Sequence, residues 1–484
     1  MSTNSEWVAG ACAAGDARNW PLHAVAGTRL LEAAHQAMPG KPSLMQSAGL
    51  ALAQLTLALA PHARVVWIAC GPGNNGGDGL QAAAHLQQWG KQVMVSYVHD
   101  PLKSPADAQA AWHAAQAAGV GFTDHIPARY DVCVDALFGI GAQRPLQGTY
   151  ADWVRAMNAS AAPTIAVDIP SGLDADTGAA QTLHVTATHT LSLLTLKPGL
   201  FTGSGRDACG DIWFNSLGVA TNETPQAWLQ TGVLRTPRLH ASHKGSFGDV
   251  CIVGGAAGMA GAALLAARSA LHGGAGRVFV CPLDPAAAML DAVQPELMFR
   301  SIGALDWAAM TLVAGCGGGH SIAEHLPGIL ARASRLVLDA DALNHIAQNA
   351  ALQAQLAQRS SGTTVITPHP LEAARLLHRT SADVQSDRLG AAQELAQRFQ
   401  CVVVLKGSGT VITQPARIAH INPTGNARLA SAGTGDVLAG LIGAKLAAGM
   451  AAFDAASQAV HQHGLAADHW QATVLSASVL CQWA

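Results

Sequence analysis

The sequence predicts an α/β protein made of two large domains, each built around a mostly parallel sheet. The chain has 484 residues, half of them apolar and only 12% charged. At roughly 100 to 200 residues per domain, this length and this apolar content predict more than one large buried core. Short apolar runs alternate with Ala-rich helical stretches, a pattern typical of parallel sheets with helical crossovers. The alternation stops once, at about 218–246, and then restarts, so we expect domains at 1–225 and 226–484.

The elements of each half follow from this alternation, taken in chain order. In the first half an apolar helix is expected over 44–60, with further helices at about 80–89 and 105–118. The strands of that half are expected at 64–70, 92–98, 130–138 and 163–169. In the second half a helix is expected at about 260–271, and the strands at 249–255, 276–281, 310–316, 335–341, 363–369 and 401–407.

Composition excludes several classes of function. A net charge of -3 supplies no basic field for nucleic acid. No continuous apolar run reaches the ~20 residues that a membrane span needs, and no basic segment precedes an apolar one at the N-terminus. We therefore expect a cytoplasmic protein with no membrane or nucleic-acid partner, and its low charge and Ala-rich helices favour a homo-oligomer. The nine cysteines form no CxxC pair and are interpreted as reduced, and the 21 histidines include no HExxH metal motif.

The sequence GPGNNGGDG (71–79) directly follows an expected strand and precedes an expected helix. Glycines at such a position let backbone N–H groups approach an anion, so a phosphate-bearing ligand is predicted. Its first six residues also match GxGxxG, and Asp100 lies where a ribose-binding acid would stand in a dehydrogenase. The polar residues Asn74, Asn75 and Asp78 go against that alternative, because a carboxylate beside a pyrophosphate repels it unless a cation or ligand hydroxyls engage it.

Two aspartates each end an apolar strand of the first half. Asp135 lies in VDALFGIGA and Asp168 in VDIPSGLDADTG, so both are expected in the same crevice as Asn75. Oxygen atoms of Asp135, Asn75 and Ser171 would suit a hard cation, while Asp168 is a candidate general acid or base.

In the second half, LASAGTGDVLAG (429–440) places glycines and Thr434 before an apolar helix, with Asp436 in its first turn. This pattern predicts an anion hole with an adjacent base for a phosphoryl-transfer reaction. No GxxxxGK[ST] sequence is present, which excludes a P-loop. LKGSGTVI (405–412) can hold a nucleotide phosphate, His369 stands at a strand end, and AGCGGG (314–319) forms another close-approach loop.

The motifs of the first half together resemble the NAD(P)H-hydrate epimerase family over about residues 20–220. LMQSAG, GPGNNGGDG, DALFGIG, DIPSGLDADTG and SLLTLKPGL occur in that family's order. The resemblance implies a Rossmann-like domain in which Asn75, Asp135 and Ser171 hold potassium and Asp168 moves the proton. The hydrated nicotinamide dinucleotide, NADHX or NADPHX, would contact Asn74, Asn75, Gly76, Gly77, Asp78, Gly139, Ile140, Gly141, Ala142, Gln143, Arg144, Pro145 and Asp168. Gln46, Ser47 and Ile140 depart from the family pattern.

The second half resembles the ADP-dependent NAD(P)H-hydrate dehydratases, a branch of the ribokinase-like fold, over about residues 235–470. GMAGAALLAA, DADALN, TPHP, SDRL, KGSGT and AGTGD occur in order. The resemblance implies magnesium together with ADP, a hydrate contacted by Ala260, Gly317, His369 and Asp436, and Asp436 as the catalytic residue. The adenine nucleotide would contact Lys406, Gly407, Ser408, Gly409, Thr410 and Gly435. Cys316, Gly318 and Leu371 depart from the pattern.

The hypothesis is a bifunctional enzyme that repairs hydrated NADH and NADPH. One domain would interconvert the R and S hydrates, and the other would dehydrate the S form while splitting ADP to AMP and phosphate. The alternative is a ribokinase-type small-molecule kinase joined to a Rossmann-like binding domain. A third hypothesis makes the first half a binding module without activity, although such a module has no need of a placed acid such as Asp168.

Overall fold

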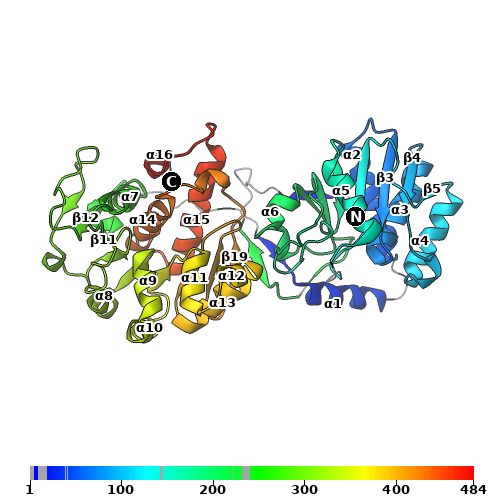
Figure 1. Cartoon of the computed structure of the whole chain (residues 1–484). Coiled ribbons are helices and arrows are strands. Elements are labelled where there is room, and N and C mark those ends of the chain that lie inside the picture. Colours follow the sequence, from blue (N-terminus) through cyan, green and yellow to red (C-terminus); the bar gives the residue numbers. More distant parts are fainter. Residues whose placement is uncertain are drawn as a thin grey trace. The chain divides into compact units, whose positions relative to one another are not determined.

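The computed structural model describes residues 5–8, 19–38, 40, 42–141, 145–221, 223–230, 232 and 240–483. They divide into two compact units, of which the first contains Glu6–Val8 and Trp20–Ala227 and the second contains Asn19 and the described residues from Trp228 onward. Each unit has a mainly parallel sheet with helices packed on it (Figure 1), so the predicted α/β class is confirmed. The boundary between 225 and 226 stays a prediction.

The first unit contains an eight-stranded sheet in which only the edge strand β1 is antiparallel to its neighbour. Its order is β1 (Glu6–Val8), β9 (Asp211–Asn215), β8 (His189–Leu193), β7 (Thr164–Val167), β6 (Val132–Ala136), β3 (Val65–Cys70), β4 (Gln92–Ser96) and β5 (Gly121–Thr123). The chain leaves β3 toward β4 and β5 and later returns to β6 on the other side of β3. This reversal of direction makes the edge beyond β3 and β6 the expected ligand crevice.

The central strand β3 explains why the sequence shows a continuous apolar run instead of an alternating one. Val66, Ile68 and Cys70 belong to the core on one face of the sheet, whereas Trp67 and Ala69 belong to the core on the other. Because helices cover both faces of a parallel sheet, successive side chains of a central strand are all buried. The polar residues at the end of such a strand therefore mark the place where the core stops.

The helices of the first unit are α1 (Val25–Gln36), α2 (Leu44–Leu59), α3 (Asn74–Gln88), α4 (Ala106–Ala117), α5 (Gly148–Ala159) and α6 (Gly205–Ala208). The helices predicted at 44–60 and 105–118 are confirmed by α2 and α4. The prediction that a helix starts near residue 80 is wrong, because α3 begins at Asn74. Most of GPGNNGGDG thus forms the first two turns of α3 and not a loop before it.

Close packing accounts for two glycines of that motif. A Cβ on Gly76 would lie 1.9 Å from the carbonyl oxygen of Gly71, and one on Gly79 would lie 2.5 Å from the Cβ of Ala136. These glycines therefore let α3 lie directly against the ends of β3 and β6. A Cβ on Gly73 would meet nothing within 4 Å. Of the glycines in this motif, Gly73 is therefore the one that borders open space, at the N-terminus of α3.

The second unit has its own sheet, in which β11 and β14 are neighbours at the centre of the parallel part. The order is β13 (Met298–Phe299), β12 (Arg277–Pro282), β11 (Asp249–Gly254), β14 (Thr311–Ala314), β15 (Arg335–Leu338), β16 (Thr364–Ile366), β17 (Val402–Leu405), β18 (Val411–Gln414) and β19 (Arg417–Ile421). Strands β13 to β17 are parallel, and β17, β18 and β19 form antiparallel pairs. After β13 the chain returns to the other side of β11 and adds β14 there, so the strand order of this sheet also reverses, between β11 and β14.

Helices α7 and α14 pack on the central strands of this sheet and on each other. The prediction of a helix at 260–271 is confirmed by α7. The helices are α7 (Ala260–His272), α8 (Leu326–Arg332), α9 (Asp341–Gln348), α10 (Ala350–Ala357), α11 (Pro370–Leu377), α12 (Ser381–Ser386), α13 (Arg388–Phe399), α14 (Thr434–Ala447), α15 (Ala452–His469) and α16 (Ala477–Trp483).

The remaining elements are short. Leu22, the last residue of strand β2 (Trp20–Leu22), forms an isolated parallel β-bridge with Leu196. Strand β10 (Ala227–Leu229) lies beside β19. The 3-10 turns are η1 (Pro101–Lys103), η2 (Pro198–Leu200), η3 (Lys244–Phe247), η4 (Ile302–Ala304) and η5 (Ala427–Leu429). Among the described residues, no helix combines the length and the apolar character that crossing a membrane requires.

Candidate functional sites at the carboxyl ends of the strands

Asp135 and Ser171 are brought together at the end of β6. Asp135 is fully buried, and its carboxylate accepts hydrogen bonds from the backbone N–H of Ser171 (2.8 Å), the Ser171 hydroxyl (2.7 Å) and the N–H of Leu137 (3.2 Å). Burial raises the pKa of Asp135 to about 6, although the bonds from Ser171 oppose that rise. Among the described residues no basic side chain pairs with Asp135. Its negative charge is therefore poorly compensated.

Asn75 lies in the first turn of α3, next to the loop that follows β6. A Cβ on Gly139 would lie 3.0 Å from the Asn75 Oδ1 atom. The Asn75 Nδ2 atom is buried and has no hydrogen-bond partner within the described part of the chain. Because rotating an amide by 180° exchanges its nitrogen and oxygen, this side chain is able to present either atom to a bound group.

Asp168 directly follows β7 and is held by a buried lysine. Lys197 is fully buried and donates to Asp168 Oδ1 and, at 2.7 Å, to the Leu193 carbonyl oxygen. The Asp168 backbone has φ +67°, a left-handed conformation that a non-glycine residue adopts at a cost of about 1 to 3 kcal/mol. Such strain concentrates at functional sites, and here it fixes the direction of a carboxylate whose side chain is 12% exposed.

Two further acids lie near Asp168. Burial raises the pKa of Asp78 well above its usual range, and the charge of Asp168 raises it further. Burial and Asp168 also raise the pKa of Glu32, which comes from α1. The sequence interpretation missed Lys197 and Glu32. The motif SLLTLKPGL contained a signal for the lysine, since a charged residue inside an apolar stretch needs a buried partner.

The loop 139–145 is only partly described. Ala142, Gln143 and Arg144 lie outside the described residues, so nothing follows about their predicted ligand contacts. Ile140 is half-buried, and Pro145 is exposed. A Cβ on Gly141 would lie 3.3 Å from the Arg29 Nη2 atom, which places an arginine of α1 beside this loop.

In the second unit, Asp436 lies in the first turn of α14, directly after the glycine turn that the sequence predicted. Gly433 caps the helix with φ +89°, a conformation that favours glycine. The first backbone N–H groups of a helix have no acceptor within it, so they point toward whatever binds there. Burial, followed by the charge of Asp339, raises the pKa of Asp436 to about 7. Asp436 therefore changes its protonation state near neutral pH.

A buried ion pair stands beside this helix end. Lys406 Nζ lies 2.6 Å from Asp339 Oδ1, and the Thr367 hydroxyl donates to the same oxygen at 2.8 Å. Burial lowers the pKa of Lys406, but Asp339 and Glu372 outweigh that effect and raise it. A Cβ on Gly435 would lie 3.3 Å from Lys406 Nζ, so the predicted residues Lys406 and Gly435 do lie together.

Cys316 completes this cluster from the loop after β14. One donor atom from each of Cys316, Asp339 and Asp436 lies within 4.8 Å of the other two. Burial, then Asp436 and Asp339, raises the pKa of the Cys316 thiol well above its usual range. The thiol is therefore protonated, and Lys406 already neutralises Asp339, so we assign no metal ion to the three residues.

His369 serves as the N-cap of α11. Its Nδ1 atom accepts from the backbone N–H groups of Leu371 (3.0 Å) and Glu372 (3.2 Å), and its Nε2 atom lies 3.3 Å from Glu372 Oε1. Both ring nitrogens are thus engaged by the histidine's own helix. Its predicted contact with a ligand would have to involve the half-exposed ring and stays a prediction.

The segment Lys406 to Thr410 forms the turn between β17 and β18. Arg388, which is 1% exposed, donates to the carbonyl oxygens of Leu405 and Lys406, each at 3.2 Å. Gly407 has φ +133°, and a Cβ there would lie 2.9 Å from the Arg388 guanidinium. The SDRL motif contains this arginine, but the sequence interpretation gave it no role. Through these hydrogen bonds Arg388 holds the backbone at the start of the turn that is predicted to bind the nucleotide.

Gly317 lies beside the start of α7, where Ala260 is exposed. A Cβ on Gly317, which has φ +56°, would lie 2.7 Å from the carbonyl oxygen of Met259. The two predicted hydrate-binding positions are therefore brought close by the loop after β14 and the loop after β11.

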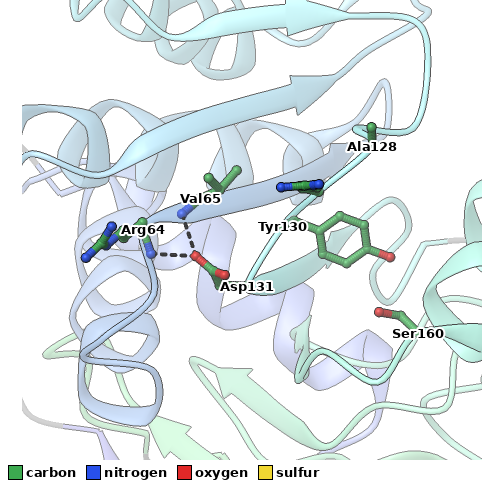
Figure 2. A pocket seen from close by; sticks show the side chains of 7 residues that line it. Arg64, Val65, Ala128, Tyr130, Asp131 and Ser160 are labelled. Atoms are coloured by element: carbon green, nitrogen blue, oxygen red, sulfur yellow. Dashed lines mark hydrogen bonds between the residues drawn. The ribbon is translucent and has the colours of Figure 1, made fainter.

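A surface pocket of about 640 Å³ lies elsewhere, at the amino ends of β3 and β6 (Figure 2). The Asp131 carboxylate accepts from the backbone N–H groups of Arg64 (2.7 Å) and Val65 (2.9 Å), which joins the two strands there. The pocket is lined by Arg64, Val65, Ala128, Arg129, Tyr130, Asp131 and Ser160. The predicted site residues Asn75, Asp135 and Asp168 lie at or beyond the carboxyl ends of β3, β6 and β7, so this pocket belongs to the opposite edge of the sheet.

Comparisons with known proteins match both halves. Residues 250–482 match the family model described as NAD(P)H-hydrate dehydratase, and residues 41–199 match the model described as YjeF-related protein N-terminus. A bifunctional NAD(P)H-hydrate repair enzyme of Escherichia coli K12 is 37% identical over 448 residues, covering 88% of this chain and 84% of the relative. One of Vibrio cholerae is 38% identical, covering 90% and 92%.

Solved structures similar to about half of the chain include two bacterial proteins. A ribokinase-like superfamily protein of Enterococcus faecalis is 26% identical with a TM-score of 0.46, covering 51% of this chain and 88% of that one. An ADP/ATP-dependent NAD(P)H-hydrate dehydratase of Bacillus subtilis, co-crystallised with ATP and Mg²⁺, is 30% identical with a TM-score of 0.42, covering 51% and 90%.

The buried pair Lys197–Asp168 predicts a non-additive pair of substitutions. Lys197→Met leaves a buried carboxylate without its cation and should destabilise the first unit by about 3 kcal/mol or more. The double variant Lys197→Met/Asp168→Asn removes that charge, so its loss should be clearly smaller than the sum of the two single losses. Hydrogen exchange of the amides of β7 and β8 measures these losses, and additive losses would show that the pair is not coupled.

Proposed function

The chain belongs to the family of bifunctional NAD(P)H-hydrate repair enzymes, and we propose that it carries out two successive reactions on hydrated NADH and NADPH. The first unit interconverts the R and S hydrates. The second unit dehydrates the S hydrate and splits ADP to AMP and phosphate. The observation that carries the proposal is Asp436, a half-buried base at a helix N-terminus, with the Lys406–Asp339 pair beside it.

In the first unit, Asp168 exchanges the proton during epimerisation. Its carboxylate is fixed by Lys197 and by the backbone N–H of Leu193, which donates to Oδ1 at 3.2 Å. Asp78 is the nearby carboxyl whose burial favours the neutral form. A carboxyl group fixed by a lysine and a second carboxyl group in its neutral form, at one site, are suited to accept and donate protons in turn. The hydrate binds along Asn74–Asp78, at the start of α3, and along the loop 139–145.

A potassium ion would bind between Asn75, Asp135 and Ser171. The residues fit a cation, because Asp135 is buried without a basic partner among the described residues and Asn75 has an unpaired amide group. When bound, the ion supplies a positive charge that offsets Asp135 close to a negatively charged dinucleotide. Asp135 and Ser171 are already oriented toward each other by their hydrogen bonds.

In the second unit, Asp436 removes the proton from the hydroxyl group of the S hydrate. As that oxygen attacks the β-phosphorus of ADP, a new oxygen–phosphorus bond forms and AMP leaves. The backbone N–H groups at the start of α14 stabilise the charge on the transferred phosphoryl group. The carbon–oxygen bond then breaks, phosphate leaves with the bonding electrons, and loss of a proton from the adjacent carbon restores the dihydronicotinamide ring.

The nucleotide is held by Lys406 to Thr410 and by Gly435. Lys406 is fixed by Asp339, so its ammonium group is in place before any ligand arrives. Magnesium, when bound with ADP, neutralises phosphate charge during the transfer. Ala260, Gly317 and His369 contact the hydrate from the loops around Asp436. We also propose a cytoplasmic location and a homo-oligomeric state. These two parts of the proposal are supported by the sequence alone.

One assay decides between the proposed repair and the alternative small-molecule kinase. Incubation with hydrated NADH and ADP should restore the absorbance of reduced nicotinamide and release AMP and phosphate. A kinase would instead leave a stable phosphorylated product. Recovery with ATP but not ADP would leave repair intact and change only the nucleotide.

Asp168→Asn should separate epimerisation from binding. Asparagine keeps the shape of the side chain but does not exchange a proton in the working pH range. With a mixture of epimers, the variant should convert the S fraction at the normal rate and then slow to the uncatalysed exchange from R to S. Complete rapid conversion of the mixture would assign the proton transfer to another residue.

Potassium dependence should be confined to the first unit. Replacing K⁺ by a bulky organic cation should lower the epimerisation rate, because Asp135 then lacks its counter-charge. Dehydration of pure S hydrate takes place in the second unit and should be unchanged. Crystals grown with Tl⁺, a heavy substitute for K⁺, should show anomalous density among the oxygen atoms of Asn75, Asp135 and Ser171. No density there would contradict the assignment.

Asp436→Ala should lower the rate of nucleotide-dependent repair by on the order of 10² to 10⁴, while epimerisation continues. In the unaltered enzyme the rate should rise with pH through a midpoint near 7, since Asp436 acts as a base only when ionised and its pKa is about 7. The measurement is kcat on pure S hydrate between pH 5.5 and 9. A rate that is flat over this range would contradict the role of Asp436.

A further inference from the structure

Helix α1 is fixed at its start to two motifs of the proposed epimerase site, DIPSGLDADTG and SLLTLKPGL. The backbone N–H of Val25 donates to Asp176 Oδ1, in the first motif, at 2.8 Å. One turn later the hydroxyl groups of Thr28 and Thr195, both buried, are hydrogen-bonded at 2.7 Å, and Thr195 belongs to the second motif. Both motifs extend beyond the carboxyl ends of β7 and β8. Helix α1 is therefore held at the edge of the sheet where the hydrate is proposed to bind.

Arg29, which directly follows Thr28, lies beside the loop after β6. Its side chain is exposed, and a Cβ on Gly141 would lie 3.3 Å from its Nη2 atom. The other end of this contact is the start of α3, because a Cβ on Gly139 would lie 3.0 Å from the Asn75 Oδ1 atom. Arg29 and the N-terminus of α3 thus flank one loop, the loop that is proposed to hold the hydrate.

The guanidinium group of Arg29 is not committed to an acidic partner. Within the described ranges of the chain, no carboxylate forms an ion pair with it. Glu32 lies three residues further along the same helix face and is close enough for its pKa to be affected, since burial and Asp168 raise that pKa while Lys197 and Arg29 lower it. Arg29 therefore reaches the proposed site with its donors available to a ligand.

This edge of the sheet is rich in carboxyl groups. Asp135 and Asp168 end two strands, and burial followed by the charge of Asp168 raises the pKa of both Asp78 and Glu32. The ionised carboxylates among them repel a pyrophosphate. Lys197 is fully buried and is bonded to Asp168, so its charge is already used. A basic side chain that is exposed and free of such a bond would favour binding of the pyrophosphate.

We propose that Arg29 is a further substrate-binding residue of the first unit, and that its guanidinium group binds the pyrophosphate of the hydrated dinucleotide beside Gly141. The inference rests on the proposed function of the first unit as an epimerase. Arginine donates two parallel hydrogen bonds to a phosphate group, so it supplies orientation as well as charge. Because hydrated NADH and hydrated NADPH share the same pyrophosphate, Arg29 serves both equally. It takes no part in the proton exchange.

The test is epimerisation of pure R hydrate by the full chain without ADP, so that the second reaction does not take place. Arg29→Gln should raise KM by roughly tenfold or more for both hydrates, which is the loss expected when a charged hydrogen bond is removed. The value of kcat should change little, because the pyrophosphate is bound equally in the ground state and the transition state. Arg29→Lys keeps the charge without the planar fork and should recover part of the loss.

Ionic strength provides a second measurement of the same contact. At a fixed K⁺ concentration, added salt screens the attraction between an exposed cation and the pyrophosphate, so KM of the unaltered enzyme should rise. The rise should be smaller in Arg29→Gln, which no longer has this attraction. A rise of equal size in the two proteins would contradict the proposed ion pair.

The matched control is Arg64→Gln. Arg64 is also exposed, but it precedes β3 and lines the pocket at the amino edge of the same sheet (Figure 2). This substitution removes the same charge from the same unit, so KM should stay where it is. An equal increase of KM in Arg64→Gln and Arg29→Gln would report only the net charge of the unit and would overturn the proposal.

Three results for Arg29→Gln would also overturn it. They are an unchanged KM, a fall in kcat at unchanged KM, and a rise in KM confined to hydrated NADPH, which would assign Arg29 to the additional phosphate of that substrate. If the unaltered enzyme does not interconvert the hydrates, the proposed function of the first unit is wrong and the inference falls with it. If it does interconvert them, the Arg29 variants decide the inference alone.

Discussion

Both units depend on a buried ion pair in which a fixed lysine neutralises a carboxylate that follows a parallel strand. Asp168 follows β7 and is paired with Lys197, and Asp339 follows β15 and is paired with Lys406. In each case the lysine comes from a later strand-end segment, so the pair also joins neighbouring parts of the sheet edge. Taking both charges out of water costs several kcal/mol unless further hydrogen bonds satisfy them. Leu193 and Thr367 supply such bonds.

The two pairs leave different acids free to react. In the first unit the paired residue, Asp168, has a side chain that is 12% exposed and is itself the proposed group for proton exchange. In the second unit the paired residue, Asp339, is closed off, and its charge instead raises the pKa of Asp436. A base whose pKa is close to the working pH combines a useful ionised fraction with sufficient basicity. A buried lysine–aspartate pair therefore supplies the proposed acid or base itself in the first unit. In the second unit such a pair acts on the neighbouring proposed base, Asp436.

The architecture was predictable because parallel strands and their helices have a strong sequence signal. The runs around Trp67 and Val134 are apolar on both faces, and the polar residues that end them mark the crevice. The start of α3 was not predictable in the same way. Gly76 and Gly79 are poor helix formers, yet close contact of α3 with the strand ends outweighs their propensity.

The partners of the site residues were harder to predict than the residues themselves. Asp135 and Ser171 lie in recognisable motifs, but nothing in the local sequence indicates that they share two hydrogen bonds or that Asp168 is paired with Lys197. Such contacts arise from the order of strands in the sheet, which brings together segments far apart in the chain. His369 shows the converse, since a motif residue expected to face a ligand has both ring nitrogens engaged in capping its own helix.

Placing the two reactions on one chain requires no shared site, because the chemistry itself couples them. Interconversion of the R and S hydrates is reversible and changes little in free energy, since the two epimers differ only at one carbon. Dehydration of the S form is made effectively irreversible by the splitting of a phosphoanhydride. The second reaction therefore draws the R form through the first by mass action alone. Each unit needs only its own crevice, and each sheet has its own switch point, the place where a ligand crevice is expected in a parallel sheet.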